Sequence, residues 1–315
     1  MKKFLVALTF ALTLAVASTA LAQTPPVGPR IGGDLTGFMS LSTSDSPAFV
    51  GRLRLTLSGA VNDRVDYAGR FVNWFWPDEN FYFGEGTGYG PSFDYGFASI
   101  RNVGPAERVD VGAIPVNRSP LRHFEGLFDQ FFRFPGVVAT SRVASNAAIS
   151  LGVGPISDPS GLHGNLLGDF QYRTSFGDFG VGAAQLYHPA SGFSIFPHSA
   201  FAEREFRVRA AVPVMGDAVK IYGEAGATQR SYSSPVGEAY DHPVASAVIG
   251  VNFPRLAKTT GYDVAGEYDL TNNVLGWELA KGLMPGVTFR TEGEIKNAAR
   301  SGYDLATQTS LMVSF

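Results

Sequence analysis

Charged side chains recur at every second position in several segments of this 315-residue chain. Arg52 and Arg54 alternate with leucines, and the segment 203–209 places Glu203, Glu205, Arg207 and Arg209 at alternate positions. Guanidinium groups form paired hydrogen bonds to carboxylates and phosphates, so such rows favour anionic solutes, although acidic residues at comparable depth weaken that preference. These residue types predict electrostatic binding or steering of solutes.

Motifs for covalent or metal-assisted catalysis are absent from the sequence. It contains no H-E-x-x-H, G-x-S-x-G or P-loop pattern, and it lacks cysteine, which excludes disulfides and thiolate metal sites. The Gly-rich stretch 84–90 precedes no helical pattern, so we interpret it as an external loop rather than a phosphate cradle. The five histidines fall in or beside predicted loops without ligand spacing: His123, His163, His188, His198 and His242. We expect a non-enzyme with no cofactor and no metal.

The elements that position the charges are predicted to be strands, because the apolar pattern has period two. In 49–59, 203–213 and 286–296, apolar residues occupy one parity and charged or small polar residues the other. A soluble sandwich would bury the apolar face, whereas a transmembrane barrel turns it to lipid and keeps the polar face wet. Segments of about ten residues and aromatic clusters at strand ends, such as 71–76 and 81–83, favour the barrel.

Turn signals give the strand number. Seven tight turns are predicted at 61–64, 103–107, 145–146, 175–178, 215–217, 255–261 and 284–286. They alternate with eight longer connections near 43–48, 77–92, 117–136, 156–163, 189–202, 231–243, 270–273 and 297–303. The pattern predicts an all-β, antiparallel barrel of sixteen strands, or fourteen if the pair around Ser145 and Asn146 is lost.

The last segment, 303–315, alternates Leu305, Thr307, Thr309, Leu311, Val313 and Phe315 with mostly polar or small residues. We expect it to pair with a first strand near 33–43, because an open sheet edge in lipid leaves backbone groups unsatisfied. A final alternating strand that ends in Phe resembles the C-terminal assembly signature of bacterial outer-membrane proteins.

The N-terminus predicts export. Lys2 and Lys3 precede an apolar stretch, and Ala20-Leu21-Ala22 supplies a cleavage signal, so residues 1–22 are interpreted as a signal peptide and 23–315 as the barrel domain. The alternative is an N-terminal membrane anchor. Without the two lysines, 23 basic residues face 28 acidic ones, a balance that argues against nucleic-acid binding. We expect a bacterial outer-membrane location, with a periplasmic protein as the alternative.

The segment 116–136 changes period. Leucine and phenylalanine recur there at three and four residues, which predicts a short amphipathic helix. Its other side would carry most of the charged residues: Arg122, Glu125, Asp129 and Arg133. Sixteen strands, short turns at one end and a long third loop resemble the general bacterial porins. That resemblance implies that the third loop folds into a water-filled barrel and narrows it, and that the chain forms a homotrimer.

In this interpretation, Glu125 and Asp129 face the pore from the third loop. The arginines opposite them occupy the alternate strand positions whose side chains face the lumen. The pore-lining candidates are Arg52, Arg54, Arg70, Arg122, Glu125, Asp129, Arg207, Arg209 and Arg290. The predicted function is passive diffusion of small hydrophilic solutes or ions, with outer-membrane lipid as the other partner. The alternatives are a substrate-specific, anion-preferring porin, a structural or adhesive barrel without transport, and an outer-membrane phospholipase. In a further alternative the charges only neutralise one another inside a plugged or narrow barrel, because the sequence offers local acidic partners for many of the arginines: Glu203, Glu205, Glu224, Glu292 and Glu294.

Overall fold

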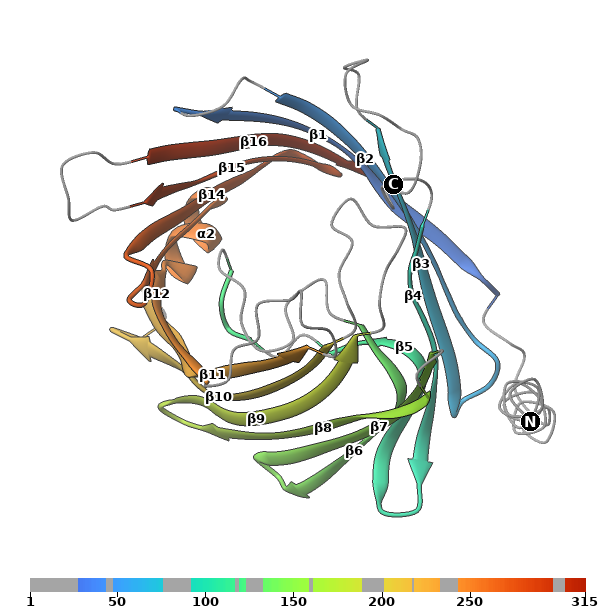
Figure 1. The fold of residues 1–315 in the computed structure, drawn as a ribbon. Helices are drawn as coiled ribbons and strands as arrows, with labels where there is room; N and C mark the ends of the chain where they lie inside the picture. The colour runs from blue at the N-terminus through green and yellow to red at the C-terminus, as the bar shows by residue number, and fades with distance from the viewer. Residues whose placement is uncertain are drawn as a thin grey trace.

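The chain forms a closed antiparallel β-barrel of sixteen strands in the computed structural model (Figure 1). The structure describes residues 28–43, 48–75, 92–116, 119–122, 133–158, 161–188, 201–216, 218–232, 243–296 and 304–315. Each strand pairs with its neighbours in sequence, and the first pairs with the last. The predicted number of sixteen is therefore confirmed, including the pair β6 and β7 around Ser145 and Asn146.

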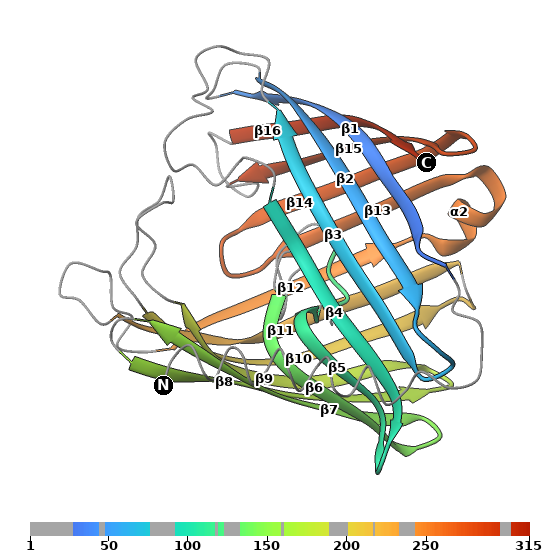
Figure 2. The ribbon, with the colours of Figure 1, turned by 90° about the vertical axis from the view of Figure 1, so that its right-hand side faces the viewer.

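The strands run from eight to fourteen residues, long enough to cross a bilayer when tilted. They are β1 (Arg30–Ser42), β2 (Ala48–Ala60), β3 (Val65–Phe75), β4 (Ser92–Val103), β5 (Ala106–Pro115), β6 (Arg133–Ala144), β7 (Ala147–Asp158), β8 (Gly161–Thr174), β9 (Gly177–His188), β10 (Phe201–Val214), β11 (Val219–Tyr232), β12 (Val244–Asn252), β13 (Tyr262–Asp269), β14 (Val274–Met284), β15 (Val287–Lys296) and β16 (Asp304–Ser314). Figure 2 shows their common tilt around the barrel.

The C-terminal residue closes the ring. The backbone N–H of Phe315 donates to the Gly33 carbonyl at 3.1 Å, and the Gly33 N–H donates to the Phe315 carbonyl at 3.0 Å. From there β1 and β16 pair continuously up to Ser42 and Ala306. The expected pairing of the first and last strands is thus confirmed, and it leaves the sheet without a free edge.

Strand β10 shows how the two faces of the wall differ. Phe206 and Val208 are 51% and 43% exposed, whereas Glu203 and Arg209, of the other parity, are 8% and 9% exposed. Apolar side chains lie on the outer face and charged ones on the inner face, the reverse of a soluble sandwich. The predicted alternation is confirmed.

The turn between β12 and β13 differs from its prediction. Instead of a simple tight turn, a short helix α2 (Pro254–Thr260) forms there, with Pro at its start and Gly261 in the left-handed conformation at its end. This arrangement of Pro and Gly is a common way to begin and end a helix. Figure 2 places α2 at the barrel end that carries the C-terminus.

The third loop was predicted to extend to residue 136, but Arg133–Gly136 already belong to β6. The amphipathic helix predicted within 116–136 falls largely on 123–132, outside the described residues. Within the described part of the chain, no helix is long and apolar enough to span a membrane.

Close approach of strands explains three glycines in β5, β6 and β7. Gly112 and Gly136 are register partners with φ of +135° and +153°, a region that favours glycine. A Cβ at Gly154 would lie 1.8 Å from the Pro135 carbonyl oxygen of the neighbouring strand. Side chains at these positions would force the wall apart.

Candidate functional site

Arg122 lies inside the barrel and binds its wall. Its guanidinium donates two hydrogen bonds to Asp263, at 2.8 and 2.7 Å, and one to Glu278 at 2.7 Å. Its backbone N–H donates to the Glu267 carboxylate at 2.5 Å. We call Ser119–Arg122 the crossing segment; Figure 1 shows it within the ring of strands.

The crossing segment reaches the opposite side of the barrel. It follows β5, and its partners lie on β13 and β14; seven strands separate β5 from β13 in either direction around the ring of sixteen. The pKa of Arg122 is raised above its ordinary value. The hydrogen bonds to Asp263 are the largest cause, and the attraction of Glu278 adds to them. The guanidinium therefore stays charged and holds the segment across the lumen.

Glu278 links the crossing segment to a second candidate arginine. Arg290 on β15 lies 3.1 Å from Glu278 and 2.7 Å from Glu292. Arg122 and Arg290 thus share one carboxylate, whose side chain is only 6% exposed. The sequence pattern indicated Glu292 as a local partner, but it gave no sign that Glu278 would bridge two arginines.

Arg52 and Arg54 lie side by side on the inner face of β2, opposite β1. Arg54 donates to Asp34 at 2.8 Å, and Arg52 lies 3.8 Å from the same carboxylate. Arg52 also lies over the Phe38 ring, 5.0 Å from its centroid. The arginines are therefore held against the wall rather than projecting freely into the lumen.

Arg70 completes this row on the adjacent strand β3. It forms an ion pair with Asp94 of β4 and lies 4.8 Å from the centroid of the Tyr95 ring. The stacking on an aromatic face adds to the ion pair and fixes the plane of the guanidinium. Strands β1 to β4 thus carry one charged sector of the inner wall.

Arg207 and Arg209 form a second sector on β10. Arg207 lies 3.9 Å from Glu205 and 3.7 Å from Glu224. Arg209 is paired with Asp169 on β8, and both side chains are almost fully buried. Glu205 and Glu224 were indicated by the sequence as possible local partners, but the pair with Asp169 was missed.

An apolar sector separates the two charged sectors along the inner face. Ile114, Phe134 and Val138 belong to a buried cluster that spans β5, β6, β8 and β9. Phe134 is completely buried, although its parity places it on the inner face. This cluster adjoins the two ends of the third loop.

The structure describes all the candidate residues except two: Glu125 and Asp129 lie outside the described residues. The other seven face the lumen, but they fall into separate sectors and each has an acidic partner. Asp34, Asp94 and Asp169, which pair with arginines, and Asp263 and Glu267, which hold Arg122, were missed. These acidic residues occupy the alternate strand positions that face the lumen, and that spacing in the sequence could have identified them. Among the described residues, no group of three or more His, Cys, Asp or Glu could hold a metal ion.

Solved structures match this architecture, although no protein-family model and no curated protein matches the chain. OmpF from Salmonella typhi, in complex with daunomycin, aligns with a TM-score of 0.65 and 9% identity, over 92% of this chain and 98% of that chain. The anion-selective porin from Comamonas acidovorans aligns with a TM-score of 0.59 and 13% identity, over 92% and 100%.

OmpT from Vibrio cholerae, in its trimer form, aligns with a TM-score of 0.59 and 8% identity, over 93% of this chain and 100% of that chain. At such identities the likeness concerns the fold. A closed ring of sixteen antiparallel strands that aligns with these outer-membrane proteins over almost its whole length establishes that this chain has the fold of the bacterial porins.

Proposed function

We propose that this chain is an outer-membrane porin that lets small hydrophilic solutes and ions diffuse passively through a charge-lined lumen. The observation that carries the proposal is the crossing segment, which Arg122 fixes to the far wall of a barrel lined by charged side chains. A sixteen-stranded barrel is wide enough for an aqueous channel, so a segment that crosses it sets the size limit.

The wall charges would act as the selectivity element. Arginines and carboxylates hold fixed positions in the two charged sectors and on β13 to β15, so their field orients polar solutes and disfavours apolar ones. We propose that Glu125 and Asp129 of the third loop add negative charge at the narrowest part. The dense pairing of charges argues for weak overall ion preference.

The remaining expectations form part of the same proposal. Residues 1–22 would be removed as a signal peptide, and 23–315 would form the barrel in contact with outer-membrane lipid. Covalent chemistry, cofactors and nucleic acid have no part in it. A homotrimer is supported by the trimer form of the Vibrio cholerae protein.

The buried apolar sector favours one alternative. A barrel whose inner face packs hydrophobic side chains can be occluded, and it would then be structural rather than conducting. The cluster around Phe134 is the observation for that alternative. It covers only part of the ring, because β1 to β3 and β13 to β15 carry charged side chains on the same face.

Single-channel recording of the refolded mature chain in a planar bilayer tests the proposal. Stable current steps are expected, and a folded barrel that passes no current would refute transport and leave the structural alternative. In a tenfold salt gradient, the reversal potential reports ion preference, with an ideal limit of about 59 mV.

Neutralising Glu125 and Asp129 together as E125Q/D129N tests their position. If they line the narrowest part, the reversal potential shifts toward anion preference by more than about 5 mV, roughly a tenth of that ideal limit. No shift in a variant that still conducts would remove both residues from the pore lining.

A further inference from the structure

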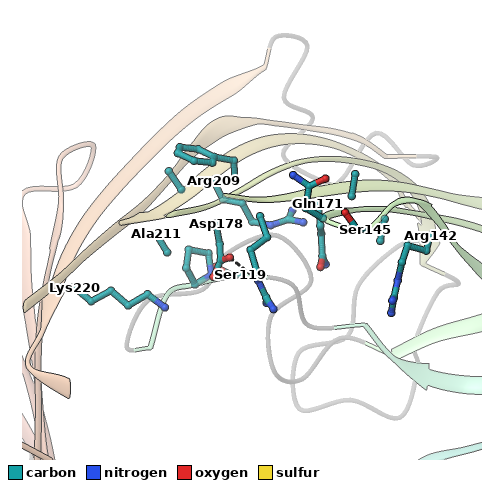
Figure 3. Close-up of a pocket in the computed structure, with 15 residues that line it drawn as sticks. Ser119, Arg142, Ser145, Gln171, Asp178, Arg209, Ala211 and Lys220 are labelled. Carbon is teal, nitrogen blue, oxygen red and sulfur yellow. Dashed lines mark hydrogen bonds and ion pairs between the residues drawn. The ribbon is translucent and has the colours of Figure 1, made fainter. Parts of the chain in front are cut away.

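A cavity of about 620 Å³ lies inside the barrel between the inner wall and the start of the crossing segment. Its volume is within the range of about 300–1,000 Å³ that is common for ligand pockets. Ser119 and Pro120 form one side, and residues from β6 to β11 form the other. Figure 3 shows Lys220 and Arg142 on opposite sides of it.

Four cationic side chains line this cavity, and Asp178 is the single acidic one among its lining residues. Three of the cations have carboxylate partners: Arg142 with Glu107 at 3.1 Å, Arg173 with Asp178 at 2.8 Å, and Arg209 with Asp169. The fourth, Lys220, has no such partner in the described part of the chain. The four cations and their three carboxylate partners, Glu107, Asp178 and Asp169, thus have a net charge of about +1.

The ion pairs of Arg142 with Glu107 and of Arg173 with Asp178 can be replaced by contacts to a ligand. The side chains of Arg142 and Arg173 are 61% and 80% exposed, and surface ion pairs contribute little to stability. A multiply charged anion that enters the cavity can therefore compete for both guanidinium groups at little cost.

Arg209 supplies the observation that points to a ligand. Its side chain is 6% exposed and Asp169 binds Nη2, yet the buried Nη1 has no hydrogen-bond partner among the described residues. A Cβ at Gly180 would lie 2.6–2.7 Å from the guanidinium, so the glycine makes the room in which it lies. A buried donor without an acceptor is costly, and a ligand oxygen would relieve that cost.

We propose that this cavity binds the phosphate group of a small phosphorylated solute on its way through the pore. Arg209 Nη1 donates to a phosphate oxygen, and Lys220 supplies the balancing charge, while Arg142 and Arg173 contact the remaining oxygens. Arginine forks and lysine point charges both suit phosphate. The proposal rests on the proposed porin function and specifies one class of solute that the pore accepts.

Calorimetric titration of the refolded barrel in detergent tests the site without requiring conduction. Glucose 6-phosphate is the probe, glucose is the uncharged control, and the buffer contains no phosphate. Saturable binding of the phosphate ester and none of glucose is expected.

Lys220→Gln removes the excess charge and keeps a polar side chain that is one atom shorter, and its matched control is Lys296→Gln on β15. We expect K220Q to weaken glucose 6-phosphate binding about tenfold and K296Q to leave it unchanged. Arg209→Lys retains a cation for Asp169 but loses Nη1, and it should weaken binding by a similar factor. A difference in gel migration between unheated and heated samples verifies that each barrel is folded.

Two results would overturn the site: no binding by the folded wild type, or equal affinities in K220Q and K296Q. Single-channel recording on the same preparations separates this inference from the proposed function. A conducting barrel that does not bind the ester refutes the site alone. A barrel that binds it in a Lys220-dependent manner but carries no current supports the site and refutes the pore.

Discussion

Replacing Arg122 with alanine is expected to release the crossing segment from β13 and β14. The variant removes the three side-chain hydrogen bonds to Asp263 and Glu278, and it keeps the backbone N–H that donates to Glu267. Glu278 retains Arg290 as a partner at 3.1 Å, so the wall itself should stay folded.

The magnitude follows from the exposure of the two carboxylates. Asp263 is 43% exposed, so its share is that of a surface ion pair, about 0–1 kcal/mol. Glu278 is 6% exposed, and a hydrogen bond to a buried charged group contributes about 1.5–3 kcal/mol. Together they give about 1.5–4 kcal/mol, which shifts the ratio of docked to released segment by about 10- to 1,000-fold.

Hydrogen exchange of the backbone amide of residue 122 measures this ratio directly. When the segment opens and recloses faster than the exchange chemistry, the exchange rate scales with the released fraction, so it should rise by the same factor. Fluctuations of the open-channel current should increase as well, since the released segment moves within the lumen.

Arg101→Ala is the matched control, because Arg101 is 54% exposed and forms an ion pair with Asp66 across β3 and β4, strands that do not adjoin β13 or β14. Its effect on the amide of residue 122 should be negligible. An exchange rate in R122A within about threefold of the wild type would refute the reasoning, since less than about 0.7 kcal/mol would then hold the segment.

Three further predictions concern the barrel and its charges. Deleting Phe315 removes both backbone hydrogen bonds to Gly33 and should lower the free energy of unfolding by about 1–3 kcal/mol in urea titrations, whereas Phe315→Ala keeps them; equal losses would contradict closure through the backbone. Gly154→Ala should cost about 2–4 kcal/mol by the same titration because its Cβ meets a carbonyl oxygen at 1.8 Å, but Gly168→Ala, with its nearest contact at 4.0 Å, should cost much less; similar costs would argue against the close approach. Ion selectivity, read from reversal potentials, should fall between about 0.01 M and 1 M salt as the Debye length shrinks from about 30 to 3 Å, and a constant selectivity would argue against a filter made of charges.

Much of the fold could be predicted from the sequence, because the information is local. Alternation with period two places Arg52, Arg54 and Arg209 on the inner face whatever their partners are. Turn residues divide the chain into strands, and the need to satisfy every backbone group in lipid requires that the last strand meet the first. The short helix α2 was missed because a connection of only nine residues, 253–261, between two strands resembles an ordinary turn.

The charged site could be predicted only in part. The sequence by itself determined which side chains face the lumen and that a loop with Arg122 follows β5. Only the tertiary structure decided that Arg122 binds Asp263 and Glu278, which lie 141 and 156 residues further along the chain. It also placed Arg209 beside Asp169 and left Lys220 without a carboxylate partner among the described residues. Such pairs depend on strand tilt and on the closure of the ring, which bring distant parts of the chain to the same height in the barrel, and no local pattern of residues encodes that height.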